Sequence, residues 1–301
     1  MKFSIYLQIL FVLILLISFS NNRRIKKSKT FAKTVTKSTC MFFKMCMYAS
    51  DAAYTPELLS KPESVWILDK IDVEGDAYGQ SVVAHHKTEN LIVVAFRGTI
   101  ITSINNLLTD IDYAQIDYPQ CKNCKVHKGF KTHFEEMSAM VQNSLAKARK
   151  ARPTAKIICT GHSLGAALAI VFAVRLYENV PSLRGNIQLV TYGSPRVGNQ
   201  AFVNYVNTFI GESKIFVVVY KGDPITSVPL VKQNYKHIGN GIRYKFSTNN
   251  SFAKENYNDS DPSFLAGLST VWHANDHRQY TSIKDAQCYR RRIRRVLRKM
   301  K

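Results

Sequence analysis

A five-residue turn, Gly161–Gly165 with the sequence GHSLG, is the feature that most limits what this chain can fold into. It follows the apolar run 157–159 and precedes the helix-forming run 166–173. A strand–turn–helix of this kind strains the backbone of its central serine, so small residues are needed two positions away on both sides. The new helix also directs its N-terminal N–H groups at that serine, where they favour developing negative charge. The pattern predicts a nucleophilic Ser163; the alternative is a tight turn with an inert serine.

Short apolar runs alternate with helical patterns along the body of the chain. The runs are continuously apolar, which is typical of strands that are covered on both faces. Their alternation with helices predicts an α/β fold with a mostly parallel central sheet flanked by helices. No repeat or linker divides residues 38–289, which we expect to form a single domain, and 249–269 is expected to be a loop. The predicted strands are 82–85, 91–96, 156–160, 187–192 and 215–220, and the predicted helices are 133–150, 166–179 and 200–210.

The formal net charge of +21 is concentrated at the two ends of the chain. Residues 1–37 and residues 290–301 each carry eight Lys and Arg and no acidic residue. The body between them is only mildly basic, at +5. A nucleic-acid-binding domain would place its basic residues within the folded body. We therefore expect no nucleic-acid partner.

Residues 3–19 are apolar except for Ser4, Gln8 and Ser18. This pattern predicts a signal peptide over 1–20, followed by a basic, propeptide-like segment over 21–37 and an extracellular location. Positive charge resists translocation, and basic residues follow the apolar run at once. A membrane anchor through residues 3–19 therefore remains the alternative.

The last twelve residues, 290–301, have the pattern of a basic amphipathic helix. Ile293, Val296, Leu297 and Met300 recur at spacings of i, i+3, i+4 and i+7, with Arg and Lys around the remainder. Such a helix lies on an anionic membrane surface. A solvated tail is the alternative.

The chain resembles the fungal-type (class 3) triacylglycerol lipases, which are α/β-hydrolases. The resemblance covers about residues 40–288, and the blocks that carry it occur in the family's order. It implies an α/β-hydrolase fold with a short lid helix. The matching blocks are Tyr48–Tyr54, Phe96–Thr99, Val126–Phe130, Gly161–Gly165, Tyr192–Gly198, Gly222–Pro224 and Asp276–His277.

The resemblance implies a catalytic triad of Ser163, Asp223 and His277. A serine hydroxyl is a poor nucleophile and needs a base within hydrogen-bond reach. His277 is the implied base and Asp223 the residue that orients it, in the chain order Ser, Asp, His that α/β-hydrolases use. His273 lies close enough to be the alternative base. His162, inside the turn, is expected to pack.

The resemblance also implies an oxyanion hole. Thr99, just after a predicted strand, supplies its backbone N–H and its hydroxyl, and Leu164, the residue after the nucleophile, supplies a second N–H. Arg97 is expected to be structural.

The segment directly after Thr99 is apolar along one helical face. Ile100, Ile104, Leu107 and Leu108 share that face. In the family this position is the lid, whose apolar side covers the site in water and opens against lipid. The alternative is a packed surface helix.

Six cysteines are too few to build a fold of this length from disulfides. Cys121 and Cys124 lie near His127, but no fourth ligand stands at a spacing typical of zinc sites, and a local disulfide is the preferred interpretation. The resemblance likewise implies a bridge between Cys121 and Cys124. It also implies that Cys288 pairs with either Cys40 or Cys46.

These observations predict a secreted serine lipase that hydrolyses acylglycerol esters through an acyl-enzyme, with no metal or organic cofactor. We expect a monomer that acts at a lipid–water interface or membrane surface. A phospholipase A or galactolipid lipase is the alternative among enzymes. A catalytically silent, membrane-docking lipid-binding protein is the alternative outside them.

Overall fold

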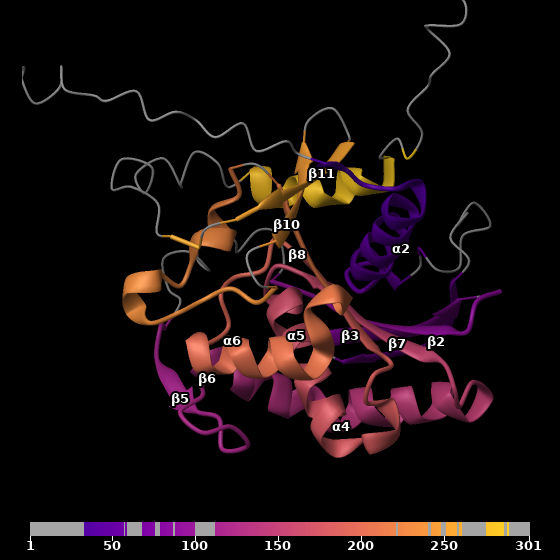
Figure 1. Ribbon diagram of the computed structural model, residues 1–301. Coiled ribbons are helices and arrows are strands. Elements are labelled where there is room, and N and C mark those ends of the chain that lie inside the picture. Colours follow the sequence, from indigo (N-terminus) through magenta and orange to yellow (C-terminus); the bar gives the residue numbers. More distant parts are fainter. Residues whose placement is uncertain are drawn as a thin grey trace, which may run out of the picture. The chain divides into compact units, whose positions relative to one another are not determined.

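A computed structural model gives the fold of the 301-residue chain (Figure 1). The predicted signal and propeptide-like segments up to residue 32, the predicted lid at 100–111 and the tail at 290–301 lie outside the described residues. No helix in the described part of the chain is long and apolar enough to span a membrane. The structure describes residues 33–56, 58, 68–75, 79–86, 88–99, 112–220, 222–239, 242–247, 251–257, 259–260, 275–285 and 288.

The described residues are built around a nine-stranded sheet with the order β1-β11-β10-β9-β8-β7-β4-β3-β2. The central strands, from β4 through β7, β8 and β9 to β10, run parallel, and the flanking strands are antiparallel. A separate antiparallel pair joins β5 and β6. The strands are β1 Lys33–Thr34, β2 Leu68–Gly75, β3 Gln80–His86, β4 Leu91–Phe96, β5 Gln115–Asp117, β6 Lys125–His127, β7 Lys156–His162, β8 Ile187–Tyr192, β9 Ile215–Tyr220, β10 Ile242–Ser247 and β11 Ser251–Asn256.

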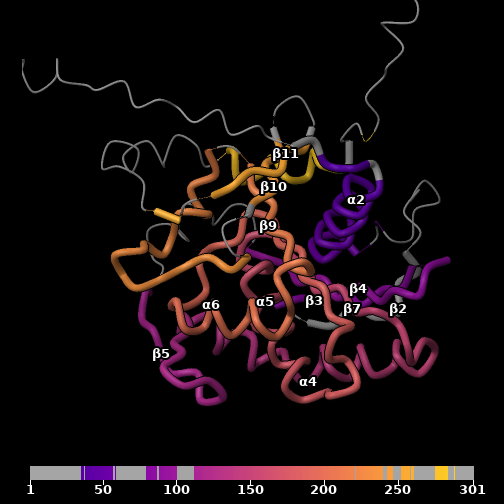
Figure 2. Tube along the Cα trace, viewed as in Figure 1, coloured from indigo at the N-terminus to yellow at the C-terminus, as the bar shows by residue number. Residues whose placement is uncertain are grey.

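Helices cover both faces of this sheet, which is why β4, β7, β8 and β9 are largely apolar. Successive strand residues point to opposite faces. In β7, Ile157 and Cys159 pack in the core formed with α4 (Lys128–Ala151) and α5 (Leu164–Asn179), whereas Ile158 packs on the other side. That second core contains α2 (Lys37–Ala52) and the 3₁₀ helix η9 (Asp276–Asp285). Figures 1 and 2 show α2 on one side of the strands and α4 on the other.

The α/β fold predicted from the sequence is confirmed, and one local prediction is wrong. Each of the five predicted strands is present. The stretch predicted as a loop from residue 249 contains β11, which pairs with β10 and β1. This strand buries Phe252 but exposes Lys254 and Asn256, so it lacks the apolar run that marks the central strands. The helix predicted over 200–210 is α6 (Gln200–Val206) continued by a π-helical turn, Asn207–Gly211.

Disulfides join Cys40 to Cys288 and Cys121 to Cys124, while Cys46 and Cys159 are buried free thiols. The structure thereby selects Cys40 over Cys46 as the partner of Cys288. Cys40 lies in the first turns of α2, and Cys288 follows η9 closely.

Removing the Cys40–Cys288 bridge in a Cys40→Ala/Cys288→Ala double variant is expected to lower the free energy of unfolding by about 2–5 kcal/mol. The bridge closes a loop with a sequence separation of 248, so it restricts the unfolded chain strongly. Guanidinium unfolding followed by circular dichroism measures the change. The matched control is Cys121→Ala/Cys124→Ala, which opens a separation of only 3 and should cost much less. Equal losses for the two pairs would contradict the loop-length argument.

Candidate active site

Ser163 lies at the junction of β7 and α5, in a backbone conformation that side-chain-bearing residues rarely adopt. It is the N-cap of α5, with φ 61° and ψ −129°. A Cβ built on Gly161 would overlap the backbone of Gly165, and one built on Gly165 would overlap the carbonyl oxygen of Phe96. The two glycines of the motif are therefore required by close backbone approach. Ser163 itself is 1% exposed.

Asp223 and His277 form a buried pair, although they are 54 residues apart in sequence. His277 Nδ1 lies 2.9 Å from both carboxylate oxygens of Asp223. Because a carboxylate only accepts, Nδ1 carries the proton and Nε2 is left as an acceptor. The backbone N–H of Ile225 donates to Oδ1 at 2.9 Å, and the hydroxyl of Tyr280 donates to Oδ2 at 2.7 Å. These contacts fix both the carboxylate and the imidazole tautomer.

The Ser163–His277 contact of the predicted triad is not made in this structure. Ser163 Oγ and His277 Nε2 are both buried, and neither has a hydrogen-bond partner among the described residues. Contacts between a catalytic base and its nucleophile are often long without substrate and tighten when it binds. The two free atoms are the ones that a proton transfer from serine to histidine would join.

The loop after β4 runs directly beside the turn that holds Ser163. A Cβ built on Gly98 would lie 3.1 Å from Ser163 Cβ and would overlap the His162 carbonyl oxygen. Thr99, the next residue, and Leu164, the first residue of α5, therefore lie at the same edge of the sheet as Ser163. Arg97 donates from Nη1 to Gln80 Oε1 at 2.8 Å, which agrees with its predicted structural role.

The sequence analysis missed Tyr280. Burial, with Asp223 beside it, raises the pKa of Tyr280 well above its usual value, so its hydroxyl remains a donor to the carboxylate. The hydroxyl also accepts from the backbone N–H of Tyr220, at 2.7 Å. A tyrosine three residues after His277, on the same face of a helix, is a signal that sequence inspection could have used.

Arg196 was also missed, and it supports the loop that follows Asp223. Its fully buried guanidinium donates to Asp259 at 2.8 Å and to the backbone carbonyls of Ser227 and Pro229. Burying a charged side chain costs desolvation free energy, which is offset only when hydrogen-bonding partners are held in place around it. Arg196 lies within the block Tyr192–Gly198, and this position in a family motif could have indicated a structural role from the sequence.

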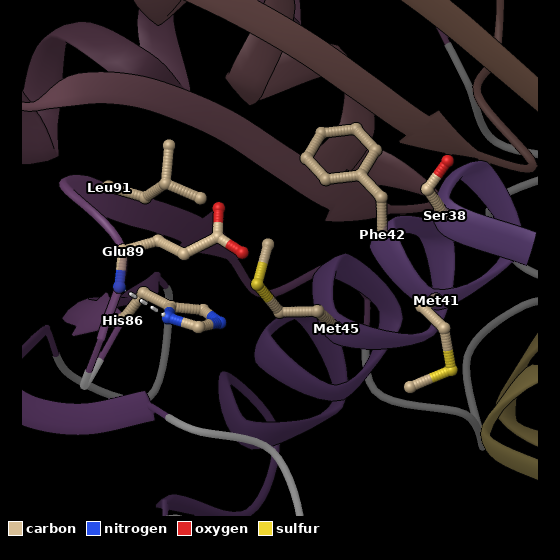
Figure 3. Close-up of a pocket in the computed structure, with 7 residues that line it drawn as sticks. All are labelled: Ser38, Met41, Phe42, Met45, His86, Glu89 and Leu91. Carbon is tan, nitrogen blue, oxygen red and sulfur yellow. Dashed lines mark hydrogen bonds between the residues drawn. The ribbon is translucent and has the colours of Figure 1, made fainter.

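Two of the cavities in the described part of the chain bear on where the site lies. One, of about 440 Å³, is lined by Leu164 together with Asp112, His127, Phe130, His133 and Glu136, among others. Because Leu164 follows Ser163 directly, this cavity adjoins the predicted site. The second, of about 410 Å³, lies between α2 and the turn joining β3 and β4 (Figure 3). None of the predicted catalytic residues lines it, so we do not assign it to catalysis.

Comparison with known proteins agrees with this geometry. The profile of the family described as Lipase (class 3) matches residues 93–233. Secreted mono- and diacylglycerol lipase 1 of Fusarium solani is 33% identical over 235 residues, covering 73% of this chain and 67% of that protein. This chain belongs to the class 3 lipase family. It is accordingly a carboxylic ester hydrolase of the triacylglycerol lipase type.

Other lipases match in sequence and in structure. A lipase of Rhizomucor miehei is 38% identical over 127 residues, which cover 42% of this chain and 34% of that protein. The structure of the Rhizomucor miehei lipase propeptide complex matches with a TM-score of 0.70 at 26% identity, covering 85% of each chain. Lipase II from Rhizopus niveus matches with a TM-score of 0.71 at 25% identity, covering 85% of this chain and 99% of that one.

Proposed function

We propose that this chain is an extracellular lipase that hydrolyses acylglycerol esters with Ser163 as nucleophile, His277 as base and Asp223 as its orienting carboxylate. The observation that carries the proposal is the buried Asp223–His277 pair at 2.9 Å, found beside a serine held at φ 61° on a strand–helix turn. A strained serine and an oriented imidazole are what nucleophilic ester cleavage requires.

In the first half of the reaction, Ser163 Oγ attacks the ester carbonyl carbon while His277 Nε2 accepts the hydroxyl proton. The resulting imidazolium keeps its Nδ1–H bond to Asp223, which stabilises the positive charge. The tetrahedral intermediate then collapses, and the protonated Nε2 gives its proton to the departing alcohol oxygen. The product of this half is an acyl ester on Ser163.

In the second half, water replaces the alcohol. His277 Nε2 accepts a proton from the water as its oxygen attacks the acyl carbon, and returns that proton to Ser163 Oγ when the fatty acid leaves. In both halves the oxyanion is held by the backbone N–H groups of Thr99 and Leu164. The N-terminal dipole of α5, directed at the same place, adds to this stabilisation.

We further propose that the natural substrate lies in a lipid phase and that the protein acts there as a monomer. Two observations support an interfacial substrate: Ser163 and His277 are almost fully buried, and the apolar face at Ile100, Ile104, Leu107 and Leu108 follows the oxyanion loop directly. A segment of this kind gains free energy by turning toward an apolar phase. Two of the relatives are secreted mono- and diacylglycerol lipases, which supports the extracellular location.

The rate of tributyrin hydrolysis is expected to rise by about tenfold or more when the tributyrin concentration exceeds its solubility limit and an emulsion forms. The reason is that an apolar phase favours the open site. The measurement is fatty-acid release by the purified full chain across the solubility limit of tributyrin, with soluble p-nitrophenyl acetate as the reference substrate. A hyperbolic curve without a break at the solubility limit would contradict the interfacial part of the proposal.

Phospholipid vesicles separate the competing activities. Phosphatidylglycerol vesicles presented to the same preparation should release little fatty acid compared with emulsified tributyrin. Fatty-acid release from the phospholipid alone would instead favour a phospholipase. The positive charge of the segment 290–301 would then attract the enzyme to the anionic vesicle surface. Folded protein without activity on any ester would contradict the hydrolase assignment and favour a lipid-binding protein.

A further inference from the structure

Two side chains outside the triad, Tyr54 and His162, join the oxyanion loop to the catalytic base. The backbone N–H of Gly98 donates to the Tyr54 hydroxyl at 3.0 Å. That hydroxyl lies 3.3 Å from Nδ1 of His162, and Nε2 of His162 lies 2.8 Å from the backbone carbonyl oxygen of His277. We refer to this series of contacts as the Tyr54–His162 bridge.

The chemistry of its ends fixes the direction of every hydrogen bond in the bridge. The His277 carbonyl only accepts, so His162 Nε2 carries a proton and donates it. In a neutral imidazole Nδ1 is then an acceptor, which receives the hydroxyl proton of Tyr54. The Tyr54 oxygen is in turn free to accept from Gly98 N–H. With His162 neutral, all three contacts form and every proton has an acceptor, whereas a protonated His162 would no longer accept the hydroxyl proton of Tyr54.

The surroundings of His162 keep it neutral. Burial, together with the neighbouring His277, holds the pKa of His162 well below its usual range. Its ring stacks on that of His277, with centroids 4.5 Å apart and planes at 30°. A second positive charge at this distance would oppose formation of the His277 imidazolium, so a neutral ring suits this position.

Close backbone packing holds the other end of the bridge in place. A Cβ built on Gly98 would overlap both the Tyr54 hydroxyl and the His162 carbonyl oxygen. The loop that presents Thr99 can thus approach the bridge only through a glycine. Tyr54 Oη is the acceptor that fixes how far this loop lies from the turn carrying Ser163.

We propose that Tyr54 and His162 are positioning residues that set the oxyanion donor at Thr99 and the base at His277 in register with Ser163. This inference rests on the proposed function. Neither side chain exchanges a proton with the substrate; each acts by holding a backbone segment that carries a catalytic group. Misplacing such groups by about 1 Å costs about 100-fold in rate.

The bridge is tested by Tyr54→Phe, His162→Leu, His162→Gln and the double variant Tyr54→Phe/His162→Leu on soluble p-nitrophenyl butyrate. Tyr54→Phe and His162→Leu are each expected to lower kcat by about 10- to 100-fold with KM changed less than about threefold. His162→Gln should recover part of the loss, because its amide can donate to the His277 carbonyl and accept from Tyr54. The double variant should lose no more than the worse single variant, because either change breaks the same bridge.

Tyr118→Phe is the matched control. It removes a buried hydroxyl that is hydrogen-bonded to Glu178, away from the triad, and should leave kcat unchanged.

If Tyr54→Phe and His162→Leu retain kcat within about twofold while the unaltered enzyme is active, the bridge is contradicted and the proposed function stands. Multiplicative losses in the double variant, or equal loss in the Gln and Leu variants, would also contradict it. If the unaltered chain cleaves no ester, the proposed function fails instead. Should His162→Leu not fold, the Tyr54→Phe result alone decides.

Discussion

Replacing Ser163 by alanine is expected to lower kcat on a soluble ester by about 10⁵- to 10⁶-fold. Without Oγ no acyl-enzyme forms, and the remaining turnover must come from water attacking an ester held in the oxyanion hole. This remaining turnover is small because only the oxyanion hole and substrate binding are left to accelerate the reaction. The measurement compares kcat of the two purified proteins on p-nitrophenyl butyrate. It is accompanied by mass spectrometry after treatment with a p-nitrophenyl phosphonate, which should label only the unaltered chain.

A matched control keeps this result specific. Ser144 is a fully buried serine of α4 whose hydroxyl donates to the Met140 carbonyl, and Ser144→Ala should retain full activity and phosphonate labelling. Alanine at position 163 must adopt the same positive φ as serine, so thermal stability should change little. Retention of more than about one per cent of kcat by Ser163→Ala would assign the nucleophile elsewhere.

The sequence was informative where one local pattern decides the structure. Gly161–Gly165 needs only its neighbouring strand and helix to be recognised, and the structure places it between β7 and α5. Strands β4, β7, β8 and β9 could also be predicted, because burial on both faces favours a continuous apolar run. β11 was missed because it buries Phe252 but exposes Lys254 and Asn256, so no apolar run marks it in the sequence.

Side-chain partners that are distant in sequence were much harder to predict. The resemblance supplied Asp223 and His277, but no local pattern reveals that side chains 54 positions apart in sequence come within 2.9 Å of each other. The contact between Tyr54 and His162 spans 108 positions and depends on how α2 packs on the sheet. His162 was expected only to pack. In the structure both of its ring nitrogens make hydrogen bonds, which hydrophobic patterning in the sequence does not predict.

Replacing Asp223 by asparagine is expected to lower kcat by about 10⁴-fold at neutral pH while leaving the fold intact. The Ile225 N–H requires an acceptor at the Oδ1 position, so the amide oxygen takes that place and the NH₂ group takes the place of Oδ2. The NH₂ group, at the Oδ2 position 2.9 Å from His277 Nδ1, favours the tautomer in which Nδ1 is an acceptor and the proton lies on Nε2. Nε2 becomes protonated and cannot accept the proton of Ser163.

Asp117→Asn is the control for this change, because Asp117 is an exposed aspartate whose ion pair with Lys125 lies in the β5–β6 ribbon. It should retain full kcat. Labelling of Ser163 by phosphonate should slow in Asp223→Asn in proportion to kcat, because the same proton transfer activates the serine in both reactions. Since the defect lies in the tautomer of the base, KM should change far less than kcat. An Asp223→Asn enzyme within about tenfold of the unaltered kcat would mean that His277 is held in its tautomer by another group, and the assignment of Asp223 would fall.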